Sequence, residues 1–257
     1  MNAPGPQAPT SAREHALYNA GLLAFRQGDE SKSQQLNKKS LDVARKLTDP
    51  AGEASALIGL SRIALRHHEY KKVIADAEKA AELRRGIGDE RGSIGAMHMV
   101  AAAERMQGND KRAEQIYEST LANFRAVGNE NGVVGELYNL AYVHLHQNHV
   151  AKAEELFGTA LQAYATRKDD ASIAYCLTGF GAVAAVKKDS VRAAHLYGAA
   201  AATLDRLGIK LDPDDQLDWD RYTAVVRREL KASFDTEFQR GKTLTLDEAI
   251  ALTKERS

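Results

Sequence analysis

The chain alternates between stretches of apolar residues spaced as on one helix face and short polar breaks. The breaks recur every 40 residues, at Gly28-Asp29, His68-Glu69, Gly108-Asn109, Asn148-His149 and Lys188-Asp189. A second set with the same step lies between them, at Thr48-Asp49, Gly88-Asp89, Gly128-Asn129, Lys168-Asp169 and Gly208. Each unit therefore holds two helices, and the spacing predicts five helical hairpins over residues 13–208.

The residues at the breaks are those that end and begin helices. Glycine favours a left-handed cap at the end of one helix, and the Asp or Asn after it can cap the next. Asp49 followed by Pro50 is the clearest start, because proline at the first helical position has no N–H to leave unpaired. These residues support the helical interpretation of the repeats.

One position in the first helix of each unit is always small, and a large side chain there would hold the two helices apart. The residues at this position are Gly21, Ser61, Ala101, Ala141 and Gly181. In the second helix of units three to five, an aromatic residue lies between two small ones, as Tyr117 does between Ala113 and Thr120. The pattern predicts a packing stripe inside each hairpin.

Leucine, a small residue, a Gly-Asp or Gly-Asn turn and then the Ala, Tyr or Phe, and Ala series together resemble the tetratricopeptide repeat (TPR). The resemblance covers residues 13–208 and implies an all-α, right-handed superhelical solenoid of about five hairpins. The family's usual period is about 34 residues. The 40-residue period here is most similar to the longer repeats of MalT-type bacterial regulators.

The two ends of the chain differ from the repeats. Residues 1–12 are rich in Pro and Ala and are expected to be disordered. Residues 209–257 are expected to form capping helices, because solenoids need capped ends. Their boundaries are marked by Asp212-Pro213, Leu230, Gly241 and a capping box of Thr245 and Glu248. This block resembles the C-terminal arm of bacterial multidomain ATPase-type transcriptional regulators.

The TPR resemblance implies that the first helices line the concave surface, which identifies side chains for a partner. Three arginines could receive a carboxylate or an acidic peptide through bidentate hydrogen bonds, beside an aromatic and polar group. The candidates are Arg62, Arg66, His98, Arg105, Tyr138, Asn139, Tyr142, His146 and Tyr175. The alternative is structural: the arginines pair with acids of adjacent helices, and the tyrosines fill the space between units.

Catalytic chemistry has no support in the sequence, which contains no glycine-rich phosphate loop, H-E-x-x-H helix or Ser-His-Asp order. The pair Asp214-Asp215 is explained by its place at the start of a helix. His144 and His146 lie on different helix faces, so no metal site is expected. Cys176 is expected to be a small buried hydrophobe. We therefore expect neither an enzyme nor a cofactor.

Lys plus Arg number 35, as do Asp plus Glu, and the formal net charge is zero. Direct nucleic-acid binding and attachment to an anionic membrane both need a basic surface, so neither is expected. No apolar run is long enough to span a membrane, and the N-terminus lacks the features of a signal peptide. A cytoplasmic location is expected.

Together these features predict a non-catalytic adaptor or regulatory scaffold whose concave groove binds a protein or peptide partner. One alternative is a small-ligand sensor arm of a bacterial regulatory system, with its affinity concentrated in a pocket near Tyr138, Tyr142, His146 and Tyr175. Another is a scaffold that self-assembles through its first repeat. The oligomeric state stays open at this stage.

Overall fold

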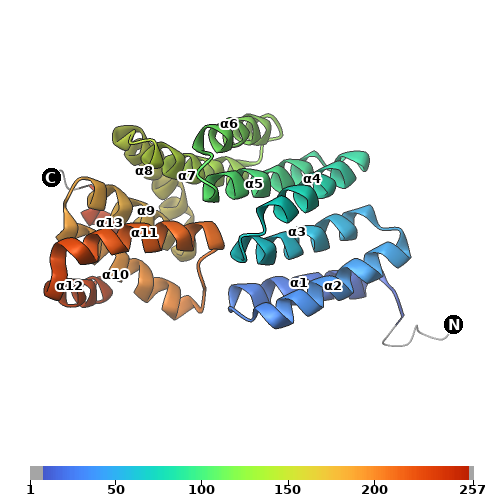
Figure 1. Ribbon diagram of the computed structural model, residues 1–257, viewed down its shortest axis with the longest axis horizontal. Coiled ribbons are helices and arrows are strands. Elements are labelled where there is room, and N and C mark those ends of the chain that lie inside the picture. Colours follow the sequence, from blue (N-terminus) through green and yellow to red (C-terminus); the bar gives the residue numbers. More distant parts are fainter. Residues whose placement is uncertain (1–7, 255–257) are drawn as a thin grey trace.

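The computed structural model describes residues 8–254, and the regular structure in this range is entirely helical (Figure 1). Ten helices pair in consecutive hairpins that stack into a right-handed TPR-type superhelical solenoid. They are α1 (Ser11–Arg26), α2 (Glu30–Leu47), α3 (Pro50–Arg66), α4 (Tyr70–Gly86), α5 (Glu90–Met106), α6 (Asp110–Ala126), α7 (Glu130–His146), α8 (Val150–Arg167), α9 (Asp170–Val186) and α10 (Ser190–Leu207). Residues 1–7, most of the segment expected to be disordered, lie outside the described residues, and α1 begins slightly before residue 13.

Capping fixes the helix boundaries at the predicted breaks. The Asp49 carboxylate accepts hydrogen bonds from the backbone N–H groups of Ala51 and Gly52 at 3.0 and 3.1 Å. The break glycines are left-handed, with φ between 63° at Gly128 and 83° at Gly28. His68 and Lys188 adopt the same conformation without glycine, at φ 59° and 65°, which costs about 1 kcal/mol each. The left-handed glycines and most of the predicted Asp and Asn caps are thus confirmed, although Asn109 makes no side-chain capping bond, and the period holds even where the glycine is replaced.

The predicted small positions lie at the contact between the two helices of a hairpin. Ser61, Ala101 and Ala141 are fully buried. A Cβ atom on Gly21 would lie 2.8 Å from Asn37 Nδ2, and one on Gly181 would lie 2.9 Å from Tyr197 Cε2. The large residue of the second helix therefore fills the space that the small residue of the first helix leaves, which confirms the packing stripe.

The C-terminal block comprises α11 (Pro213–Leu230), a short 3-10 turn (Lys231–Ser233), α12 (Phe234–Lys242) and α13 (Leu246–Leu252). α12 and α13 pack on the last hairpin, where a capping segment was expected. The contact with α12 is close, because a Cβ atom on Gly198 would lie 2.2 Å from the Phe238 carbonyl oxygen. Thr245 and Glu248 form the predicted capping box.

α11 has a different position from α12 and α13, since it lies inside the superhelix against α3, α5 and α9 (Figure 1). Hydrogen bonds also join it to α7. The odd-numbered helices of the hairpins therefore form the inner surface, and α11 of the same chain fills part of it. The expectation of a simple cap for residues 209–257 did not include this placement.

The linker before α11 also meets the first repeat. The backbone N–H of Lys210 donates a hydrogen bond of 3.0 Å to the carbonyl oxygen of Arg26, at the end of α1. Figure 1 shows this linker, in orange, beside the blue end of α1. The segment after the last hairpin is thus joined directly to the first hairpin. Within residues 8–254, no helix has both the length and the apolar character needed to cross a membrane.

Candidate functional site

The first turns of α11 bring three aspartates into the concave groove, where they meet Arg105 of α5. Arg105 is 1% exposed and donates to Asp214, with Asp218 at 3.6 Å and Asp215 at 3.9 Å. Burial alone would lower the pKa of Arg105, but Asp214 and the neighbouring acids raise it well above its usual value. This arginine therefore stays charged and is the counter-ion of α11.

Two further side chains of α7 hold the same turns of α11. The Tyr138 hydroxyl donates a 2.8 Å hydrogen bond to Asp215. His146 Nε2 lies 2.7 Å from Asp218 Oδ1, and its Nδ1 lies 3.1 Å from Asp110 Oδ1. Burial lowers the pKa of His146, but its contacts with the two aspartates outweigh burial and raise it. The groove therefore recognises an acidic helix, and that helix belongs to the chain itself.

The structure divides the predicted arginine cluster. Arg66 pairs with Glu30 at 3.1 Å and covers the ring of Phe25, Arg105 is buried under α11, and Arg62 faces a cavity. The aromatic group is brought together, since the rings of Tyr138 and Tyr142 lie 5.3 Å apart. Its edges pack against α11 and α8 instead of facing open solvent.

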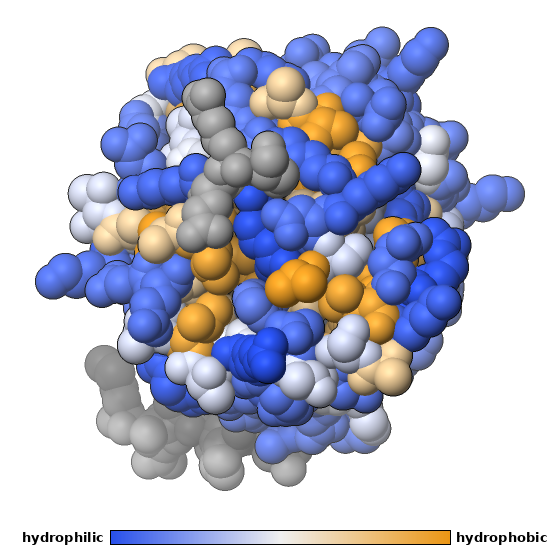
Figure 2. All heavy atoms as spheres, turned by 90° about the vertical axis from the view of Figure 1, so that its left-hand side faces the viewer, coloured by the Kyte–Doolittle hydropathy of each residue, from blue (hydrophilic) through white to orange (hydrophobic). Residues whose placement is uncertain are grey.

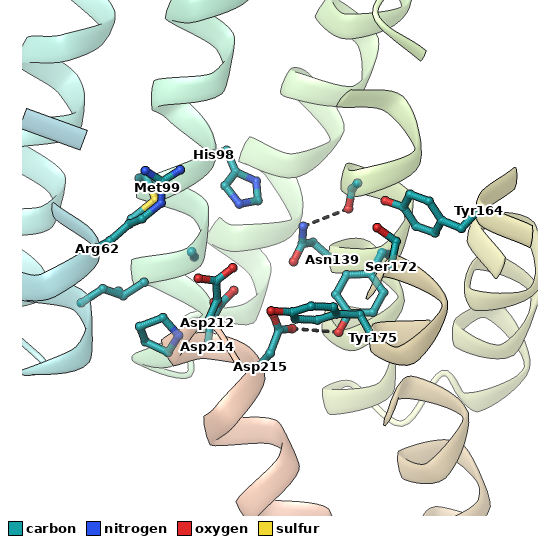
Figure 3. A pocket seen from close by; sticks show the side chains of 15 residues that line it. Arg62, His98, Met99, Asn139, Tyr164, Ser172, Tyr175, Asp212, Asp214 and Asp215 are labelled. Atoms are coloured by element: carbon teal, nitrogen blue, oxygen red, sulfur yellow. Dashed lines mark hydrogen bonds between the residues drawn. The ribbon is translucent and has the colours of Figure 1, made fainter. Parts of the chain in front are cut away.

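A cavity of about 200 Å³ lies where the start of α11 leaves the inner surface (Figure 3). Five of the nine predicted residues line it, namely Arg62, His98, Tyr138, Asn139 and Tyr175. Asp212, Asp214 and Asp215 of the α11 segment line another part, and Tyr164 and Ser172 complete the side formed by α8 and α9. Figure 3 shows Arg62 and His98 on one side and the three aspartates below them.

Two charged groups of this cavity have no hydrogen bond or ion pair within the described residues. Arg62 Nη1 is buried and lacks a partner. Asp212 is the N-cap residue of α11, yet its side chain makes no capping bond. Burial raises the pKa of Asp212, as does Asp214, while the charge of Arg62 opposes the shift. Opposite charges thus lie near each other across the cavity without pairing.

Burial also shapes the other ionisable groups of the cavity. It raises the pKa of Asp215 well above its usual value, and Asp214 adds to the shift while Arg105 opposes it. His98 Nδ1 lies 3.3 Å from both carboxylate oxygens of the buried Glu136. Burial lowers the pKa of His98, but Glu136 outweighs burial and raises it. The cavity therefore offers both basic and acidic groups to a ligand.

The aspartates of α11 are the site residues that sequence reasoning missed. Asp214 and Asp215 were explained by the start of a helix and Asp218 was not considered, yet all three are at most 7% exposed. Their spacing of three and four residues places Asp215 and Asp214 on the same helix face as Asp218. The sequence did contain a signal for this contact: an acidic stripe on one helix face, and three arginines on the expected inner surface that needed acidic partners.

A second hollow, of about 1130 Å³, lies at the C-terminal end between α8 and α13. Leu161, Phe180 and Ile250 contribute its apolar lining, and Figure 2 shows apolar patches divided by hydrophilic side chains on this end of the molecule. Its charged pair, Glu154 and Lys187, is satisfied at 2.7 Å. In this respect it differs from the inner cavity.

Two further features of the sequence analysis, the histidines as metal ligands and Cys176, can be placed in the described part of the chain. No group of three or more His, Cys, Asp or Glu residues between 8 and 254 could hold a metal ion. Cys176 is fully buried, and burial raises the pKa of its thiol far above the usual value, so it is no nucleophile.

Comparisons with known proteins agree with the fold. No family model and no curated protein matches the chain. Among solved structures, the apo form of RapI is similar at 12% identity with a TM-score of 0.58, covering 88% of this chain and 87% of RapI. BtubC (BKLC) from P. vanneervenii is similar at 16% identity with a TM-score of 0.54, covering 92% and 91%. At these identities the likeness establishes the fold alone: this chain is a TPR-type solenoid.

Proposed function

We propose that this chain is a non-catalytic protein-interaction scaffold that binds a segment of a partner protein in the open part of its concave groove. α11 covers the inner surface over α9, α7 and parts of α3 and α5. Beyond it, a hollow of about 210 Å³ lined by Tyr18, Ile58, Arg62 and Gly95 continues along α1, α3 and α5. TPR-type solenoids are generally non-enzymatic scaffolds, which supports this assignment.

The observation that carries the proposal is the free space beside two glycines of the inner surface, here called the trough: Gly95 lines the hollow of about 210 Å³ and Gly135 lines the cavity of about 200 Å³. Gly95 and Gly135 lie one repeat apart, and a Cβ atom at either would meet nothing within 4 Å. A glycine inside a helix costs up to about 1 kcal/mol relative to alanine, so two at an empty surface need a reason other than packing. Space for a partner's backbone beside Arg62 supplies one.

The proposal is tested by affinity capture from the native cytosol with Gly95→Gln, Arg62→Glu and the control Arg125→Glu, which lies exposed on α6. Both groove variants should lose a protein that wild type and the control retain, because one fills the trough and the other reverses its charge. Retention of the same proteins by all four forms would contradict groove binding.

A second candidate function is a small-ligand sensor arm of a bacterial regulatory system. The cavity favours it, because Tyr138 and Tyr175 of the predicted pocket line it together with the start of α11. A ligand there would contact α3, α5, α7, α9 and α11 together, and so would alter the curvature of the solenoid. The resemblance to MalT-type repeats and to the C-terminal arm of multidomain regulators supports this role.

A further inference from the structure

The side chains of the cavity at the start of α11 indicate which class of small molecule it could bind. This inference rests on the second candidate function, the ligand sensor. We infer that this cavity binds a small zwitterion with one carboxylate and one ammonium group, of the class of the free amino acids. The inference rests on two charges without a hydrogen bond or ion pair in the described part of the chain, Arg62 and Asp212, which line the same cavity together with polar and aromatic residues.

The basic side of the cavity fits a carboxylate. Arg62 Nη1 is buried without a hydrogen-bond partner, and no ion pair of Arg62 exists within residues 8–254. A buried donor without an acceptor costs about 1–3 kcal/mol, more when it is charged. A ligand carboxylate at this point would satisfy the guanidinium with a charge-assisted bond. His98 lies beside it and keeps Nε2 for the ligand, because Nδ1 is taken by Glu136.

The acidic side fits an ammonium group, which needs up to three acceptors. Asp214 is already paired with Arg105, whereas Asp212 has no partner among the described residues and Asp215 accepts one bond from Tyr138. Asn139 donates its amide N–H to the Gly135 carbonyl at 2.9 Å, which leaves its Oδ1 as an acceptor. Asp212, Asp215 and Asn139 together can therefore surround one cationic group.

A ligand with a single charge fits less well. An anion at Arg62 would face three aspartates, and a cation at Asp212 would face the arginine, so each would meet a like charge. A zwitterion satisfies both sides and adds no net charge to a buried space. The volume of about 200 Å³ is below the roughly 300 Å³ of drug-sized pockets. The rings of Tyr164 and Tyr175 supply an apolar wall for a side chain.

The test is isothermal titration calorimetry on the purified full-length chain with each standard L-amino acid at millimolar concentration. For any amino acid that binds, the titration is repeated with its decarboxylated amine and with its N-acetyl derivative, each of which lacks one of the two charges. We expect at least one amino acid to bind and both derivatives to bind about tenfold more weakly, or worse.

Two variants assign the charges. Arg62→Gln should lower the affinity for the amino acid to the affinity that wild type has for the amine. The affinity for the amine should not change, because the amine has no carboxylate to interact with Arg62. Asp212→Asn should lower the affinity for the amino acid to that of wild type for the N-acetyl derivative, and should leave the affinity for that derivative unchanged. Matched controls are Arg125→Gln and Asp42→Asn, both exposed and outside the cavity. Circular dichroism melts check folding, and neither cavity variant should lower Tm, since neither side chain has a partner to lose.

Three outcomes would overturn the inference: no amino acid binds, a singly charged derivative binds as tightly as its parent, or neither cavity variant changes the affinity. The experiment contains no partner protein. A negative titration would therefore contradict the amino-acid ligand only, and the scaffold proposal would still be tested by the affinity capture.

Discussion

Arg105 and Asp214 form a buried ion pair that joins the third repeat to α11. They are 109 residues apart in the chain, and only 1% of the arginine is exposed. Asp218 lies 3.6 Å from the same guanidinium. The pair is the chief electrostatic contact between α11 and the inner surface, so the position of α11 depends on it.

Replacing Arg105 with Met should destabilise the protein by about 3–5 kcal/mol at neutral pH, because Asp214 and Asp218 would remain buried without a counter-ion. Urea unfolding followed by circular dichroism measures the loss. The exposed Arg125→Met should change stability by no more than about 0.5 kcal/mol. A loss for Arg105→Met as small as that of the control would show that α11 does not depend on the pair.

The contribution of His146 should be greatest in acid. Burial lowers its pKa, but Asp110 and Asp218 raise it above the unfolded value of 6.5, while Arg105 opposes them. The stabilisation from the charged ring is therefore fully present below pH 6.5 and is lost as the pH rises through the folded-state pKa. The difference in unfolding free energy between wild type and His146→Gln should shrink over this range. A constant difference from mildly acidic to alkaline pH would refute the assignment.

Asp215 should destabilise the folded protein at neutral pH. Burial and Asp214 raise its pKa well above the unfolded value of 3.8, so its stability contribution is complete below that value and is lost as the pH rises. Asp215→Asn cannot ionise and can still accept from Tyr138. The variant should be about 1–3 kcal/mol more stable than wild type at pH 7, and urea titrations at decreasing pH should show this gain disappear. A variant less stable at pH 7 would contradict the prediction.

Gly198 should tolerate no side chain. A Cβ atom there would lie 2.2 Å from the Phe238 carbonyl oxygen, so Gly198→Ala must push α12 away from α10. A loss of about 1–3 kcal/mol is expected, together with faster hydrogen exchange in α12. Gly158→Ala is the matched control, because that helical glycine has nothing within 4 Å, and it should gain up to about 1 kcal/mol. Similar melting temperatures for both variants would refute the close-approach argument.

The repeat architecture could be predicted from sequence because its determinants are local. A cap such as Asp49-Pro50 acts on residues three positions away, and a small residue such as Gly181 meets an aromatic residue of the next helix. The 40-residue step then places every hairpin against its neighbour. Each of these features can be recognised in the sequence without knowing which distant residues are in contact.

The place of α11 could not be predicted in the same way. Its amphipathic pattern shows that Tyr222 and Val226 are buried, but a pattern does not identify the element that covers them. The pairing of Asp218 with His146 joins residues 72 positions apart, and no local pattern indicates it. Four residues of the expected partner surface therefore contact other parts of the same chain, namely Arg105, Tyr138, Tyr142 and His146.

The hydrogen bond between Lys210 and Arg26 changes how the whole array should respond to force and heat. In an open solenoid each repeat touches only its neighbours, so terminal repeats fray independently and the array behaves as a one-dimensional spring. Here the linker and α11 connect the first hairpin, the middle repeats and the last hairpin. A displacement at one end should therefore be transmitted to the other, and we expect the hairpins to unfold together as one cooperative unit.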